Sequence, residues 1–99
     1  MNIEFIKYGT TLTVKPEGRL DTATSPELEK RMAPEMEGMT EIIIDMERVE
    51  YISSGGLRVL LAAEQEMEDR DGQMKVIHVN DVIMEIFEVT GFTDILAIE

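Results

Sequence analysis

The 99 residues of this chain are enough for one domain with its own core and too few for a second independent fold. The absence of cysteine and the single histidine, His78, exclude a disulfide framework and argue against metal sites built on thiolates or clustered histidines. Lysine plus arginine number 9 against 21 aspartate plus glutamate, and the net charge of -12 repels nucleic-acid phosphates and anionic lipid headgroups. With no apolar run of membrane-spanning length and no basic-then-apolar N-terminal segment, we expect a cytoplasmic protein that binds neither nucleic acid nor membrane directly.

The N-terminal segment predicts an antiparallel hairpin. Ile3 and Phe5, and then Leu12 and Val14, alternate with polar residues as in strands, and Gly9-Thr10 supplies the turn between them. Pro16 and Gly18 should end or bend the second strand. Residues 19–22 are expected to belong to this end or bend, ahead of a short connecting loop.

A helix is expected to begin near Thr24 or Ser25. Pro26 suits a first helical turn, and Thr24 with Glu27 forms a possible capping box. Pro34 should kink the helix or end it early, and Gly38 is a possible terminator. Apolar residues at three- and four-residue intervals predict one buried stripe, typical of a core: Leu28, Met32, Met36 and Met39.

The second half of the chain alternates strands and helices. Residues 41–46 form a β-branched run with polar ends, typical of a strand buried on both faces and central in a sheet. Residues 75–79, which include His78, predict another strand, and Ile95 to Ile98 a short final one. A helix between them should be capped by Asn80 or Asp81 and closed by Gly91. We therefore predict one α/β domain over residues 1–99, with a mixed sheet that starts with an antiparallel hairpin.

Between these elements, residues 51–61 (Tyr-Ile-Ser-Ser-Gly-Gly-Leu-Arg-Val-Leu-Leu) predict a strand that turns directly into a helix continuing to about Gly72. The first turn of a helix has unpaired backbone N–H groups and the positive end of the helix dipole, so it favours a negatively charged group. Ser53 and Ser54 stand at that point. The simpler interpretation is that a serine caps the helix and the glycines only permit the turn.

The motifs of several enzyme classes are missing, and we expect neither catalysis nor a metal or other cofactor. No Gly-Lys-Ser/Thr follows Gly55-Gly56, which argues against a nucleotide-binding P-loop. His78 in a predicted strand is a poor candidate for the base of a hydrolase. Asp45 ends a buried strand as in a phosphoaspartate receiver, but no adjacent acidic pair in the first strand could hold magnesium.

Nearly the whole chain resembles a STAS domain of the bacterial anti-sigma factor antagonist type. The resemblance rests on the order and spacing of four segments: Gly18-Arg19-Leu20-Asp21, Ile42-Ile43-Ile44-Asp45, Tyr51-Ile52-Ser53-Ser54-Gly55-Gly56-Leu57 and Val89-Thr90-Gly91-Phe92. In such antagonists, the unphosphorylated protein binds an anti-sigma factor that is also a serine/threonine kinase. Phosphorylation of a serine at the start of the second helix breaks this contact, and a serine phosphatase restores it.

By position, the resemblance implies that Ser54 is the phosphorylated residue. The preceding residue is usually aspartate in these antagonists and is Ser53 here, which leaves Ser53 as an alternative acceptor. Other proteins with similar domains are interaction subunits of signalling or transport complexes without a phosphorylation cycle, and this is the second functional hypothesis. The expected partner-binding residues are Asp21, Thr22, Ser53, Ser54, Gly55, Gly56 and Arg58. Asp21 could equally be a turn or cap residue, and Arg58 could contact a partner or a phosphate.

Overall fold

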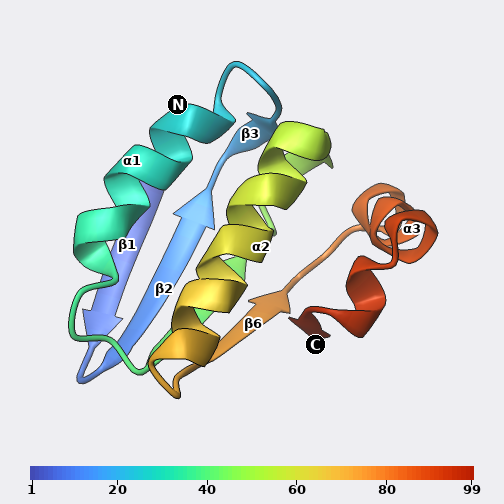
Figure 1. Ribbon diagram of the computed structural model, residues 1–99. Coiled ribbons are helices and arrows are strands. Elements are labelled where there is room, and N and C mark those ends of the chain that lie inside the picture. The colour runs from blue at the N-terminus through green and yellow to red at the C-terminus, as the bar shows by residue number, and fades with distance from the viewer.

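The computed structural model describes residues 1–99 and contains a five-stranded mixed sheet (Figure 1). The first two strands pair antiparallel, and the remaining neighbours pair parallel. In spatial order the strands are β1 (Ile3–Tyr8), β2 (Thr11–Pro16), β4 (Glu41–Asp45), β6 (Gln73–Ile77) and β7 (Ala97–Ile98). The predicted hairpin, the central position of β4 and the α/β fold class are therefore confirmed.

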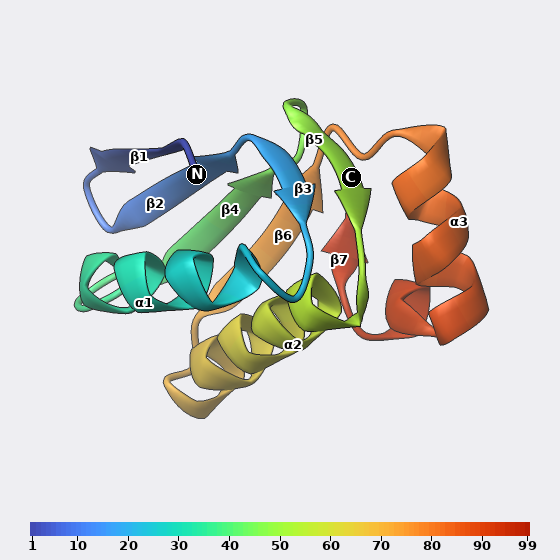
Figure 2. The ribbon, with the colours of Figure 1, turned by 90° about the horizontal axis from the view of Figure 1, so that it is seen from above.

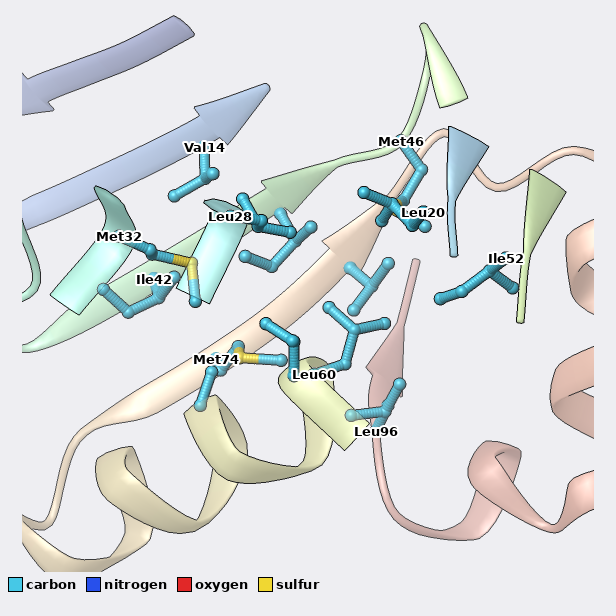
Figure 3. Packing of buried hydrophobic residues seen from close by; sticks show 14 of the residues in the cluster. Val14, Leu20, Leu28, Met32, Ile42, Met46, Ile52, Leu60, Met74 and Leu96 are labelled. Atoms are coloured by element: carbon cyan, nitrogen blue, oxygen red, sulfur yellow. The ribbon is translucent and has the colours of Figure 1, made fainter. Parts of the chain in front are cut away.

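Two helices, α1 (Ser25–Glu35) and α2 (Ser54–Asp69), lie side by side on one face of this sheet (Figures 1 and 2). The core lies between these helices and the sheet, as Figure 3 shows. Alternate residues of β2 and β4, among them Val14, Ile42 and Ile44, point toward the helices and are fully or almost fully buried. None of the α-helices has the length and apolar character needed to cross a bilayer.

A second, two-stranded sheet was only partly anticipated. It consists of β3 (Gly18–Leu20) paired parallel with β5 (Val49–Ile52), and Leu20 lies opposite Ile52. The sequence predicted that residues 19–22 end or bend the second strand, and it did not predict the separate strand at Gly18–Leu20. A strand of three residues is too short for an alternating pattern to reveal it. Its partner strand also lies far along the chain, so no local hairpin pattern indicates the pairing.

The methionine stripe of α1 is confirmed, but the predicted capping box is not. Leu28, Met32 and Met36 are buried, and Met39 packs against the core in part. The Thr24 side chain makes no capping bond, because its hydroxyl donates to the Arg19 carbonyl at 2.6 Å. The helix ends at Glu35, one residue after Pro34, so it stops before Gly38.

The connection from β6 to α3 (Asp81–Thr90) contains a second correction. β6 ends at Ile77, so His78 lies outside the strand, with a φ of 58° that histidine tolerates better than most residues. Its Nδ1 is 2.9 Å from Oδ1 of Asp45, a buried carboxylate at the end of β4. Asn80 caps α3 and Gly91 ends it with a left-handed backbone, as expected. The 3-10 helix η1 (Phe92–Asp94) then leads into β7.

Candidate functional site

The site predicted from the sequence lies where β5 turns into α2. Ser53 has an extended backbone, and its N–H donates to the Leu20 carbonyl at 2.9 Å, so this turn is attached to β3. Ser54 is the first residue of the helix, and the Leu57 N–H donates to the Ser53 carbonyl as the first helical bond. The expected strand-to-helix turn is confirmed.

The two serines differ in accessibility. Ser54 is exposed at the first helical position, whereas the Oγ atom of Ser53 is buried and makes no hydrogen bond. The Ser53 side chain does not cap α2, and the first turn contains no acidic residue. The first backbone N–H groups of α2 therefore have no side-chain acceptor, which leaves the positive end of the helix dipole available to a negative group on Ser54. The simpler interpretation, in which a serine side chain caps this helix, does not describe the structure.

The glycines allow other parts of the same chain to approach the helix start. A Cβ atom on Gly56 would lie 2.6 Å from Cγ1 of Ile52 and 2.9 Å from Cβ of Leu20. A Cβ atom on Gly55 would lie 3.2 Å from the carbonyl oxygen of Asp21 and from Cα of Thr22. Gly56 is buried, and the space beside it is occupied by β3 and β5. Both glycines bring the loop after β3 against α2.

Asp21 organises this loop. Its Oδ1 accepts hydrogen bonds from the backbone N–H groups of Ala23 and Thr24, both at 3.0 Å. The bond from Thr24 is the main reason that the pKa of Asp21 lies below its usual value. Partial desolvation acts to raise this pKa, but the bonds from Thr24 and Ala23 together outweigh it. Asp21 is therefore a turn residue, which is one of the roles that the sequence allowed for it, and it also lies next to the start of α2.

A shallow depression beside the helix start brings three of the predicted residues together: Thr22, Gly55 and Arg58. Four further residues line it that the sequence analysis did not identify, namely Ser25, Pro26, Glu29 and Val59. Arg58 is exposed and forms no salt bridge within the chain. Ser25 is only 2% exposed, and its Oγ has no hydrogen-bond partner. Ser25 and Glu29 are four residues apart, so the sequence alone places them on one side of the predicted helix. Only the packing of α1 against α2 brings them next to Gly55.

Sequence comparison identifies the class of protein that carries this site. The sequence profile of the STAS domain family matches residues 2–99, so the chain belongs to the STAS domain family. Within that family it belongs with the anti-sigma factor antagonists. It is 32% identical to an anti-sigma-B factor antagonist of Staphylococcus aureus over 97 aligned residues. The alignment covers 97% of this chain and 90% of the relative.

Solved structures show the same fold. The anti-sigma factor antagonist SpoIIAA in its unphosphorylated form matches with a TM-score of 0.76 and 17% identity, over 99% of this chain and 87% of SpoIIAA. An anti-sigma factor antagonist from Mycobacterium paratuberculosis matches with a TM-score of 0.87 and 20% identity, over 98% of this chain and 83% of the other. The overall fold is thus that of known antagonists.

Proposed function

We propose that this protein binds an anti-sigma factor that is also a serine/threonine kinase, and that phosphorylation of Ser54 by this kinase releases it. A serine phosphatase then returns the protein to its binding state. The observation that carries the proposal is the exposed residue Ser54 at the uncapped start of α2. The similarity to an anti-sigma-B factor antagonist supports the choice of partner.

The location of Ser54 explains how a phosphate could stop binding without unfolding the protein. A phosphoserine carries nearly two negative charges, and the N–H groups and dipole of the first turn stabilise such charge. Arg58, one helical turn further, supplies an unpaired cation on the same helix. The same phosphate placed against a docked partner must lose its hydration and disturb the contact surface. The domain therefore stays folded while its partner dissociates.

The surface around Ser54 forms the proposed contact with the kinase. Thr22 and Arg58 contribute side chains, the loop held by Asp21 contributes backbone, and Gly55 keeps that loop close to the helix. Ser53 and Gly56 act indirectly in this proposal, because the Ser53 hydroxyl and the Gly56 backbone are buried. A net charge of -12 favours a kinase with a basic docking surface.

Phosphorylation by a purified anti-sigma kinase tests the proposal directly. We expect one phosphate per chain on the wild-type protein, mapped to Ser54 by mass spectrometry. Ser53→Ala should still be phosphorylated and Ser54→Ala should not, because Ser54 is exposed and the Ser53 hydroxyl is buried. Phosphate on Ser53 alone would move the site. Tight binding with no phosphate on either serine would instead support an interaction subunit without a phosphorylation cycle.

A further inference from the structure

An apolar groove runs between α1 and α2 next to the proposed contact surface; we refer to it as the α1–α2 groove. Its volume is about 200 Å³. Six apolar residues form most of its lining: Met32, Ala33, Met36, Val59, Ala62 and Ala63. Its polar residues are Glu29, Glu66 and Arg70. Met32, Met36, Val59 and Ala63 are buried, whereas Ala33 and Ala62 are exposed. A hollow with this apolar lining is a candidate site for an apolar group from outside the chain.

The two ends of the groove differ. At the far end, Nη1 of Arg70 donates to the Met36 carbonyl at 2.7 Å, and its Nη2 pairs with Glu66, so the ends of the two helices are joined. At the near end, Glu29 and Val59 line both the groove and the depression beside Ser54. The groove therefore continues the surface around Ser54 and is closed on the other side.

Size and charge indicate what the groove would bind. Pockets for small organic ligands usually measure about 300–1,000 Å³, so a groove of about 200 Å³ suits one large apolar side chain better than a free ligand. Glu29 forms no salt bridge within the chain, so its carboxylate can pair with an external cation. A second copy of this chain, with a net charge of -12 and the same carboxylates, would be repelled.

We propose that the α1–α2 groove receives an apolar anchor side chain of the anti-sigma factor, flanked by a lysine or arginine that pairs with Glu29. This inference rests on the function proposed above. It divides the interface into two parts, a switchable part at Ser54 and a constant hydrophobic part between the helices. A buried anchor in a pocket is the kind of contact that carries a large share of the affinity at protein interfaces.

Ala62→Leu is the variant that tests the groove. Ala62 is exposed and lines the groove, and leucine is nearly as good a helix former as alanine, so the larger side chain should fill the space without disturbing α2. We expect at least about tenfold weaker binding of the purified anti-sigma kinase in a calorimetric titration. Gln65→Leu adds the same side chain at an exposed position of α2 outside the groove and should bind like the wild type.

The charged part of the contact needs its own variant. Glu29→Lys places a cation at the near end of the groove and should weaken binding, with the largest loss at low salt. Glu68→Lys makes the same charge change at an exposed position of α2 that does not line the groove. It should weaken binding less, because both variants alter the net charge equally and only Glu29 faces the proposed cation.

The results separate the groove from the function on which it rests. If the wild type does not bind the kinase, the proposed function and the groove assignment both fail. If the wild type binds and Ala62→Leu binds equally well, only the groove assignment fails. It also fails if ultracentrifugation shows a dimer of the wild type that Ala62→Leu dissociates, or if native mass spectrometry shows a small apolar molecule that this variant expels.

Discussion

The starts of α2 and α3 contrast with each other although both follow a strand. At α3, the Asn80 side chain accepts from the Ile83 N–H at 2.8 Å, donates to the Val49 carbonyl, and is followed by Asp81 in the first turn. At α2, the Ser53 side chain makes no such bond and the first turn has no acidic residue. Of these two helices, the one without a side-chain cap has an exposed serine at its first position. The helix α1 also lacks a side-chain cap, but its first residue, Ser25, is buried and Glu27 lies in its first turn.

The starts of α2 and α3 therefore differ in whether their first N–H groups can stabilise a charge that is added later. A cap satisfies the first N–H groups within the chain and holds the connection in place. An uncapped start on a helix that is otherwise well packed leaves those groups available to a charge added later. In this protein the packing of Gly56 against β3 and β5 holds α2 in place of a side-chain cap.

Making the start of α2 resemble that of α3 should have the largest effect. Ser54→Asp places a carboxylate where α3 has Asp81. We expect about 100-fold weaker binding to the anti-sigma kinase, equivalent to about 2.7 kcal/mol, with an unchanged circular dichroism spectrum. Ser54→Ala should retain full affinity. Asp81→Ser, the reverse change at α3, serves as the control, and equal affinity of Ser54→Asp and Asp81→Ser in a titration would contradict the switch.

Gly56→Ala tests whether packing replaces the cap at α2. The added Cβ would approach Ile52 and Leu20 within 2.9 Å, and it would also meet the carbonyl oxygen of Leu20, which cannot move without shifting β3. We expect a loss of about 1–3 kcal/mol in the free energy of unfolding, measured by urea denaturation. Gly55→Ala, whose closest contact would be 3.2 Å, should cost less. The explanation fails if the two variants are equally stable.

Removing the side chains at the two cap positions should affect stability unequally. Asn80→Ala loses the bonds to Ile83 and Val49 and should reduce the free energy of unfolding by about 1 kcal/mol. Ser53→Ala removes a hydroxyl that makes no hydrogen bond, so its effect should remain within about 0.5 kcal/mol. Thermal unfolding of the two variants provides the measurement, and a larger loss for Ser53→Ala would mean that Ser53 is a cap after all.

Acid should weaken the connection before α3 through Asp45. Burial acts to raise the pKa of Asp45, but hydrogen bonds from His78 and from the Glu47 backbone outweigh it, so the pKa lies below the usual value of 3.8. The stabilisation is therefore present above pH 3.8 and lost as the pH falls through the lower folded-state pKa. Asp45→Asn should be about 0.5–1 kcal/mol less stable at pH 7. This difference in stability should vanish in acid. If it persists at pH 2, it has a cause other than the charge of Asp45.

The sequence predicted most of the long elements, because their hydrophobic periods are regular. Ile42 to Ile44 identified the central strand, and Leu28, Met32 and Met36 identified the buried side of α1. The errors occurred where local rules compete with distant partners. The Thr24 hydroxyl bonds to Arg19 and not within its helix, and the strand before His78 ends earlier than its apolar pattern suggested.

At the site, the sequence located the serines but could not rank them by exposure. The ranking depends on the burial of the Ser53 hydroxyl, which follows from the position of β3. The lining residues of α1 and the α1–α2 groove also escaped prediction. Each helix shows a periodic pattern by itself, but their relative placement is a property of the packed structure, and it is this placement that makes Glu29 and Val59 line the same groove.

The hydrogen bond from the Ser53 N–H to the Leu20 carbonyl has a consequence for how a kinase meets its substrate. Residues 20 and 53 are distant in the chain, so the shape of the segment around Ser54 depends on the non-local pairing of β3 with β5. A free peptide with the sequence of residues 45–60 would lack that shape. This peptide should be a poor substrate. A kinase that recognises the site by its shape would therefore modify only folded chains.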